Sequence, residues 1–388
     1  MYSTISRLAF VLCGLLIAVG SAQADFLYVQ TNLVTSDQSV VQAQHTDPSL
    51  INPWGLSYST TGPLWVSDQG TGFATVYQLK GASSSGTLLT VPIPNDGGAP
   101  PSVANGPTGQ VSTGAPGVTT LATDFQVNGA KAAFIFANLD GSISAWRGGL
   151  PNNTAIIRTT VAGASFTGLA IGNTSGGAAR IYAADQNSGN VDVFNSNWAM
   201  TGTITAPSLP PGFTAFNVQN LGGNLFVTSA NPNDPTGGVV DEFTTDGKFV
   251  ATISSDPTGN HLDSPWGLAI APASWGQFAG DLLIGNNGGD GTINAFTLGG
   301  AWQGQIVLNN GQPFSEQQLW GLTFGNGGLG GSPDVLYFAA GFDAAADEGL
   351  LGALSPVPEP SSAVLVLSAV SLLAGGRAYK NARRRLPQ

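Results

Sequence analysis

The chain has 388 residues, of which 23 are Asp or Glu and 12 are Lys or Arg, so its formal net charge is −11. Half of the basic residues lie in the two terminal segments, which leaves the body strongly acidic. This charge disfavours a nucleic-acid partner, because phosphate binding requires a basic face, and it favours weak cation binding.

Residues 1–24 are typical of a secretory signal peptide. Arg7 supplies the positive start, residues 8–19 form the apolar helical run, and Ala22 and Ala24 mark a small-x-small cleavage site. A permanent N-terminal anchor is the alternative, but the apolar run is short for a bilayer. Cys13 is the only cysteine and lies in this segment, so the exported part carries no thiol for a disulfide, a catalytic cysteine or a thiolate-bound metal.

A three-strand pattern recurs along the rest of the chain. Its clearest copy begins with Trp266-Gly267-Leu268 and contains three short apolar runs separated by Asn, Asp and Gly turns. Alternating runs with these turn residues indicate β-hairpins. The copies repeat about every 50 residues. They lie at residues 52–79, 117–146, 166–194, 216–243, 264–298 and 319–354.

Sheets that repeat in this way cannot bury both of their faces alone, so they must pack on one another. The sequence therefore predicts an all-β, six-bladed β-propeller over residues 25–356. Residues 26–34 form a further predicted strand with no blade of its own. The segment that follows it, 44–56, resembles 260–268, which comes after a predicted outer strand. By this match, residues 26–34 supply the outer strand of the last blade and close the ring.

Residues 81–117 are rich in Gly, Pro and Ser. Within them, residues 87–93 are the predicted outer strand of the first blade, and most of the remainder is a long loop. Loops of this length in a compact domain are often binding elements. A solvated surface excursion is the alternative.

Polar residues follow the second strand of several predicted blades, close to the expected central channel. A ring of such carboxylate and amide oxygens could hold Ca²⁺. The alternative is that Asp and Asn cap the strands and turn the hairpins. The residues are Asp68, Asn138, Asp185, Asn231 and Asn286.

This ring resembles the metal centre of gluconolactonase-type propellers. The resemblance implies a divalent ion that polarises a lactone carbonyl. That family also uses a metal-binding glutamate near the start of the domain, whereas the glutamates of this body, Glu242, Glu316 and Glu348, all occur late. The missing glutamate weakens the comparison.

The remaining candidate functional residues are histidines and tryptophans. His45 and His261 occupy equivalent loops of two blades, which favours a local turn role over a shared site. Trp54, Trp266 and Trp320 share one repeat position, and we expect them to pack between blades, with a sugar-stacking platform as the alternative. The sequence has neither a Ser-His-Asp order nor a phosphate-binding Gly-rich loop.

Residues 357–388 form a tail of three parts. Pro358-Glu359-Pro360 comes first, and the uncharged, mostly apolar residues 361–376 follow it. Sixteen helical residues span about 24 Å, slightly less than the roughly 30 Å of a bilayer core, so a transmembrane helix is expected. A basic cluster then holds this end in the cytoplasm by the positive-inside rule. The cluster consists of Arg377, Lys380, Arg383, Arg384 and Arg385.

The tail resembles the PEP-CTERM sorting signal of Gram-negative bacteria. The resemblance implies recognition of Pro358, Glu359 and Pro360 by an exosortase, transient anchoring in the cytoplasmic membrane, and export to the cell surface or extracellular matrix. A permanent single-pass anchor is the alternative. The body is similar to an uncharacterised family of secreted six-bladed propellers with repeats of NHL and gluconolactonase style, which brings no established activity.

Two classes of function remain. The first is a noncatalytic surface or matrix protein that binds exopolysaccharide or other surface proteins through its loop face. The second is a divalent-metal-dependent lactonase or hydrolase at the channel. Propellers host both classes. The missing glutamate, the scarcity of histidine and the sorting tail favour the first.

Overall fold

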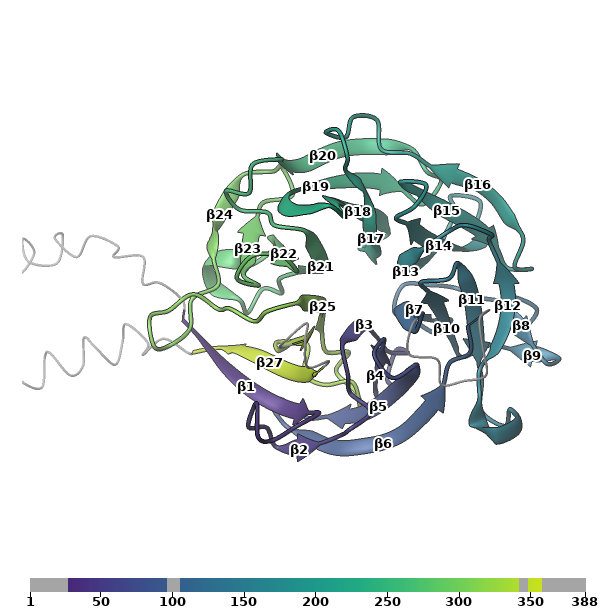
Figure 1. Ribbon diagram of the computed structural model, residues 1–388, viewed down its shortest axis with the longest axis horizontal. Helices are drawn as coiled ribbons and strands as arrows, with labels where there is room; N and C mark the ends of the chain where they lie inside the picture. Colours follow the sequence, from purple (N-terminus) through teal and green to yellow (C-terminus); the bar gives the residue numbers. More distant parts are fainter. Residues whose placement is uncertain (1–26, 96–104, 342–347, 358–388) are drawn as a thin grey trace, which may run out of the picture. The chain divides into compact units, whose positions relative to one another are not determined.

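The computed structural model describes residues 27–95, 105–341 and 348–357. Six sheets of four or five strands surround a common axis, which makes a six-bladed β-propeller (Figure 1). The fold class and the blade count are confirmed. The predicted signal segment, the sorting motif, the apolar span and the basic cluster lie outside the described residues. In the three described ranges, no helix is both long and apolar enough to span a membrane.

The first five blades are antiparallel meanders whose strands follow one another from the axis outward, and the last blade adds β1 (Tyr28–Thr35) and the short parallel strand β2 (His45–Thr46) to three such strands. The first blade contains β3 (Pro53–Ser57), β4 (Leu64–Asp68), β5 (Phe73–Leu79) and β6 (Ser84–Pro92). The second contains β7 (Pro107–Ser112), β10 (Phe134–Asn138), β11 (Ser142–Trp146) and β12 (Ile156–Thr160). The third contains β13 (Phe166–Asn173), β14 (Ala179–Asp185), β15 (Asn190–Asn195) and β16 (Met200–Ile204).

The other three blades follow the same order. The fourth contains β17 (Thr214–Leu221), β18 (Asn224–Asn231), β19 (Asp234–Thr244) and β20 (Phe249–Asp256). The fifth contains β21 (Pro265–Ile270), β22 (Leu282–Asn286), β23 (Ile293–Phe296) and β24 (Trp302–Gln305). The last contains β25 (Leu319–Phe324), β26 (Leu336–Ala340), β27 (Leu350–Pro356), β1 (Tyr28–Thr35) and β2 (His45–Thr46).

Three short elements lie between these strands. A small hairpin, β8 (Gln126–Val127) with β9 (Ala130–Lys131), stands beside the second blade. The two 3₁₀ turns are η1 (Pro151–Asn153) and η2 (Gly276–Phe278).

The ring closes where the two ends of the domain share one sheet. β1 pairs antiparallel with β27, from Tyr28 opposite Pro356 to Thr35 opposite Leu350. Figure 1 shows these two strands side by side, one purple and one yellow. The predicted closure by residues 26–34 is therefore confirmed. This pairing joins strands from opposite ends of the domain within the last sheet, so both ends are held in the ring.

The first strand of the second blade differs from the prediction. Residues 117–121 form no strand, and the innermost strand is β7, which lies inside the predicted long loop. The sequence pattern does not reveal β7, because its residues, Pro-Thr-Gly-Gln-Val-Ser, have almost no apolar alternation. It is nevertheless completely buried, because it packs against the backbone of neighbouring inner strands rather than against large side chains.

A ring of small positions on the inner strands explains this close packing. A Cβ atom built on Gly55 would lie 2.5 Å from the carbonyl oxygen of Thr108, and one on Gly321 would lie 2.6 Å from that of Trp54. Gly109, Gly168 and Gly267 meet the next blade in the same way. The fourth blade carries Asn217 instead, whose amide donates to the carbonyl oxygen of Trp266 at 2.8 Å. Glycine is thus required because the next backbone occupies the space of a side chain.

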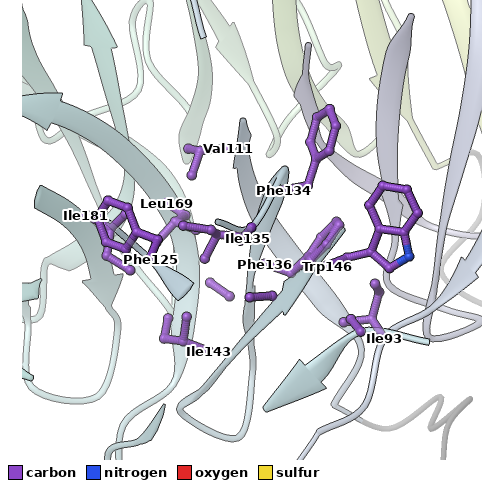
Figure 2. Close-up of a cluster of buried hydrophobic side chains, with 14 of the residues drawn as sticks. Ile93, Val111, Phe125, Phe134, Ile135, Phe136, Ile143, Trp146, Leu169 and Ile181 are labelled. Atoms are coloured by element: carbon purple, nitrogen blue, oxygen red, sulfur yellow. The ribbon is translucent and has the colours of Figure 1, made fainter. Parts of the chain in front are cut away.

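Large apolar side chains fill the wider spaces between blades farther from the axis. Figure 2 shows one such cluster, which includes Phe134, Phe136 and Trp146 of the second blade together with Ile93. The ring of Trp65, from the first blade, stacks on that of Phe134 with 4.0 Å between centroids. Burial of apolar area at about 25 cal/mol per Å² makes these interfaces the main stabilising contribution to the ring.

Candidate binding site at the channel mouth

Four aromatic side chains close one end of the central channel. Trp54, Trp266, Trp320 and Phe216 all lie near the beginning of an inner strand and form one buried cluster. The rings of Trp54 and Trp320 stack with 3.5 Å between centroids, and Trp266 meets both rings edge-on. The expectation that the three tryptophans pack between blades is confirmed, because the three rings come from different blades and contact one another. Their shared repeat position brings them together on the axis.

The opposite end of the channel is open and forms a cavity of about 230 Å³. Its wall comes from the last residues of five inner strands and from the loop after β7. Aliphatic side chains such as Leu169 and Ile171 alternate there with amides and hydroxyls. We call this cavity the mouth. Its polar lining residues are Ser57, Tyr58, Gln110, Ser112, Gln219, Asn220 and Thr323.

Two glutamines dominate the inner part of the mouth. The amide of Gln110 donates to the carbonyl oxygen of Gly55 at 2.8 Å, but its own side-chain oxygen is buried without a partner in the described protein. Gln110 is only 4% exposed. The side-chain oxygen of Gln219 accepts from the backbone N–H of Leu268 at 2.8 Å. Because a buried acceptor without a partner costs about 1–3 kcal/mol, the Gln110 oxygen is poised to receive a hydrogen bond from water or a ligand.

A smaller cavity of about 20 Å³ lies between the mouth and the tryptophan cluster. Gln110, Asn217, Gln219 and Trp266 contribute to its wall. This volume is enough for about one water molecule with several polar partners. The channel therefore narrows from the open mouth to the smaller cavity and ends at the four aromatic side chains.

The mouth has no charged group in the part of its wall that the structure describes. Its only titratable side chain is Tyr58, whose hydroxyl donates to the carbonyl oxygen of Phe324 at 2.5 Å. Burial raises the pKa of Tyr58 above its ordinary value, and the nearby Thr323 hydroxyl opposes this rise only in part. The mouth can thus donate and accept hydrogen bonds but offers no carboxylate or imidazole for proton transfer.

The long loop predicted within residues 81–117 contributes to this site. Ala115, Pro116 and Val118 form part of the wall of the mouth. Both interpretations of this loop, binding element and solvated excursion, stay predictions. Its end lines the mouth, and residues 96–104 lie outside the described part.

The asparagines of the predicted metal ring make hydrogen bonds to neighbouring strands and loops, and the amide of Asn286 also donates to the carbonyl oxygen of His261 at 2.9 Å. The amide of Asn138 donates to a hydroxyl of the next strand at 3.0 Å, and that of Asn286 donates to a hydroxyl six residues later at 3.2 Å. The side-chain oxygen of Asn231 accepts from a backbone N–H two residues later at 3.0 Å. These bonds are those of strand-end and hairpin residues.

The two aspartates of the predicted ring differ from each other. One oxygen of Asp185 accepts from the backbone N–H groups of Ser165 and Asn187, at 2.8 and 3.1 Å. Asp68 is fully buried, and no hydrogen bond of normal geometry reaches its carboxylate oxygens in the described protein, although the Thr75 hydroxyl lies close by. Its neighbour is the carboxylate of Asp47 rather than another member of the ring. A shared Ca²⁺ on these five residues stays a prediction.

The two histidines have separate surroundings. The Nε2 atom of His45 lies 2.8 Å from the carbonyl oxygen of Ser84, and the ring of His261 stacks on that of Trp302 at 4.3 Å. Across the described ranges, no group of three or more His, Cys, Asp or Glu side chains is arranged to hold a metal ion.

Sequence reasoning does not find the residues that line the mouth. Gln110 follows the ring glycine Gly109, a position that holds Leu56, Leu169, Leu268 and Leu322 in other blades. In the sequence, this lining residue can be recognised only as a polar residue at the position where other blades have leucine. The comparison cannot be made while the inner strand of the second blade is assigned to residues 117–121.

Comparison with known proteins adds relatives without an assigned activity. No described family matches the sequence. An uncharacterized protein of Acanthamoeba polyphaga mimivirus is 29% identical over 304 residues, covering 73% of this chain and 70% of the relative. A second uncharacterized protein of the same virus is 28% identical over 354 residues, covering 84% of this chain and 85% of the relative.

Similar solved structures are more distant in sequence. Virginiamycin B lyase from Staphylococcus aureus aligns with a TM-score of 0.43 and 11% identity over 86% of this chain and 100% of that chain. The structure of BBS1N in complex with ARL6DN aligns with a TM-score of 0.39 and 14% identity over 77% of this chain and 76% of that chain. Similarity at this level carries no statement about activity.

Proposed function

We propose that the protein is an exported, noncatalytic binding propeller that holds a neutral, hydroxyl-rich ligand, such as a segment of exopolysaccharide, in the mouth of its channel. The observation that carries the proposal is the wall of the mouth, which combines aliphatic surface with amides and hydroxyls and has no charge among its described residues. Binding pockets typically combine apolar surface with a few oriented polar groups. Sugar hydroxyls both donate and accept hydrogen bonds, as these amides and hydroxyls do.

The partner-free oxygens of the mouth support a ligand that donates hydrogen bonds. The Gln110 side-chain oxygen and the Ser57 hydroxyl are both buried without a partner in the described protein. A ligand hydroxyl bound to either group would remove the cost of that burial. An anionic ligand is disfavoured, because the described wall has no Lys or Arg to receive it.

The lactonase alternative requires different chemistry. A metal-dependent hydrolase needs oxygen or nitrogen ligands for the ion and a group that transfers protons. The described wall of the mouth offers Tyr58 as its only titratable group, and its hydroxyl is already engaged with a backbone carbonyl. This donor set favours binding over hydrolysis.

The proposal of export and processing is based on the two terminal segments of the sequence. We propose that residues 1–24 direct secretion and that an exosortase recognises Pro358-Glu359-Pro360, which would release the propeller to the cell surface or matrix. The support is the order of motif, apolar span and basic cluster in the sequence. The mass of the protein recovered from an exosortase-bearing bacterium tests this proposal, and an intact C-terminus would overturn it.

The binding proposal is tested with a pair of serine variants in one blade. Ser57 lines the mouth and Ser67 does not, yet the hydroxyls of both are buried without a partner in the described protein. Removing either hydroxyl therefore breaks no hydrogen bond within the described fold. Ser57→Ala should weaken binding about three- to tenfold, the effect of about one hydrogen bond, whereas Ser67→Ala should leave it unchanged.

The measurement begins with the purified chain on a glycan array that includes neutral exopolysaccharide fragments. The strongest binder is then titrated calorimetrically against the wild type and both variants. Equal affinity of the Ser57→Ala variant and the wild type would place the ligand elsewhere. Lactone hydrolysis that is lost on chelation and in Asp185→Ala would instead support the enzymatic alternative.

A further inference from the structure

A second cavity lies in the third blade, at the hairpin between β14 and β15. Its volume is about 340 Å³, and its wall includes residues of that hairpin together with residues 161–164. Two aspartates, Asp185 and Asp192, contribute to this wall, and no Lys, Arg or His does so among the described residues. The cavity therefore contains two negative charges with no positive side chain to offset them.

The strand register explains why these oxygens gather on one face. Asp185 lies opposite Asn190 in the β14–β15 pair, and Asp192 lies opposite Thr203 in the β15–β16 pair. Asn190 and Asp192 are two residues apart on one strand, so their side chains point to the same face of the sheet. Directly opposed side chains have Cβ atoms about 4.5–5.5 Å apart, and diagonal neighbours remain within reach. The blade thus presents four oxygen-bearing side chains in a staggered row across β14, β15 and β16, with Asp185 and Asp192 as diagonal neighbours.

Asp192 is the unusual member of this row. It is only 2% exposed, and no hydrogen bond reaches its carboxylate within the described protein. It lines the same cavity as the carboxylate of Asp185. A buried carboxylate beside another carboxylate is unfavourable unless a cation compensates it.

Asp185, the diagonal neighbour of Asp192, keeps one oxygen available. Both hydrogen bonds received by Asp185 use its Oδ1 atom, which leaves Oδ2 without a partner in the described protein. The amide of Asn187 donates to the carbonyl oxygen of Gly163 at 3.0 Å, so its side-chain oxygen is also available. These groups are hard oxygen donors, which suit Ca²⁺.

We propose that the β14–β15 hairpin holds a Ca²⁺ ion through the carboxylates of Asp185 and Asp192, with oxygens of Asn187 or Thr203 and water completing its shell. Ca²⁺ takes six to eight oxygen ligands in flexible geometry, which a hairpin face open to a cavity can supply. The site lies in one blade and is separate from the mouth. It therefore uses Asp185 in a different setting from the predicted ring of five residues around the channel.

The test is calcium titration of the full chain after removal of metal with a chelator. Calorimetry should show one binding site with a dissociation constant of about 10⁻⁴–10⁻³ M, the range of extracellular calcium modules. About 5 mM Ca²⁺ should raise the Tm by about 1–3 °C, because the ion binds only the folded chain. Both effects should disappear in Asp192→Asn.

Two control variants make the result specific. Asp234→Asn removes an exposed turn carboxylate of the next blade, and its calcium response should match that of the wild type. Asp68→Asn removes a buried carboxylate at the equivalent strand end of the first blade, and it should also respond normally. A calcium response that persists in Asp192→Asn, or one that is lost in Asp68→Asn, would overturn the proposal. The absence of any response in the wild type would overturn it as well.

Discussion

At the scale of single residues, the molecule combines well-bonded turn residues with a few buried groups that lack partners. Asp68 is the clearest example of the second kind. Burial raises the pKa of Asp68 well above its ordinary value, the Thr75 hydroxyl opposes this rise in part, and the charge of Asp47 adds to it. Asp47 itself accepts hydrogen bonds from the hydroxyls of Tyr77 and Thr87, at 2.8 and 2.6 Å. The carboxylates of Asp47, next to the last blade, and Asp68, in the first blade, therefore repel each other in the folded protein.

The predicted consequence is that Asp68→Asn stabilises the protein. A carboxyl whose pKa is raised in the folded state does not destabilise the protein below its unfolded pKa of about 3.9. Above that pH, the free energy of unfolding decreases until the pH reaches the folded pKa. The amide variant is free of this loss, so its advantage should grow with pH and reach about 1–3 kcal/mol at neutral pH. Urea denaturation at pH 4 and pH 7.5 measures the difference. A wild type that is more stable than the variant at pH 7.5 would contradict this account.

At the scale of elements, the inner strands differ from all other strands in what they pack against. Outer and middle strands bury apolar side chains between sheets, whereas inner strands place glycine against the backbone of the next blade. This is why Trp-Gly-Leu recurs in the sequence, and why β7 can serve as an inner strand with little hydrophobicity. Its Thr108 hydroxyl donates to the carbonyl oxygen of Phe166 at 2.7 Å, which adds a polar tie to the third blade.

A methyl group on β7 should therefore be poorly tolerated. Gly109→Ala would place Cβ against the backbone nitrogen of Leu169, and backbone cannot move aside as a flexible side chain can. We expect a loss of about 3 kcal/mol in the free energy of unfolding, at the upper end of overpacking effects. Gly202→Ala in the outer strand β16 is the matched control, since a Cβ there meets nothing within 4 Å. Chemical denaturation of both variants checks the prediction, and equal stabilities would refute it.

At the scale of the whole described domain, stability depends on closure of the ring. β1 carries Leu33 into a fully buried cluster with Leu64 and Val66 of the first blade and Tyr337 and Leu351 of the last. One side chain of the closing strand therefore holds two blades together. Each blade packs on two neighbours, so the loss of this contact affects the ring as a unit.

Leu33→Ala should destabilise the whole propeller by about 2–5 kcal/mol, the usual cost of such a cavity. Val29→Ala in the same strand should cost less than about 0.5 kcal/mol, because Val29 is 37% exposed. Tryptophan fluorescence and far-ultraviolet circular dichroism should report the same lowered midpoint for Leu33→Ala. Two separated transitions would mean that the last blade unfolds independently of the others.

Much of this architecture could be predicted from the sequence. Period-2 alternation, Asn, Asp and Gly turns and the Trp-Gly-Leu repeat identify most strands, because they describe contacts within one blade or its immediate environment. The match between residues 44–56 and 260–268 is sufficient to assign the closing strand. The inner strand of the second blade could not be found in this way, since β7 is buried by backbone contacts that leave no apolar pattern.

The candidate sites could be predicted only in part. The sequence by itself determined the six-sheet ring and its closure, because strand periodicity and repetition are local properties of the chain. Only the tertiary structure decided that three tryptophans meet on the axis, that Gln110 and Gln219 line the open mouth, and that Asp185 and Asp192 share a cavity. These side chains come from different strands, and for the tryptophans and glutamines from different blades. Their meeting depends on strand register and on the rotation from one blade to the next, which no single segment of sequence encodes.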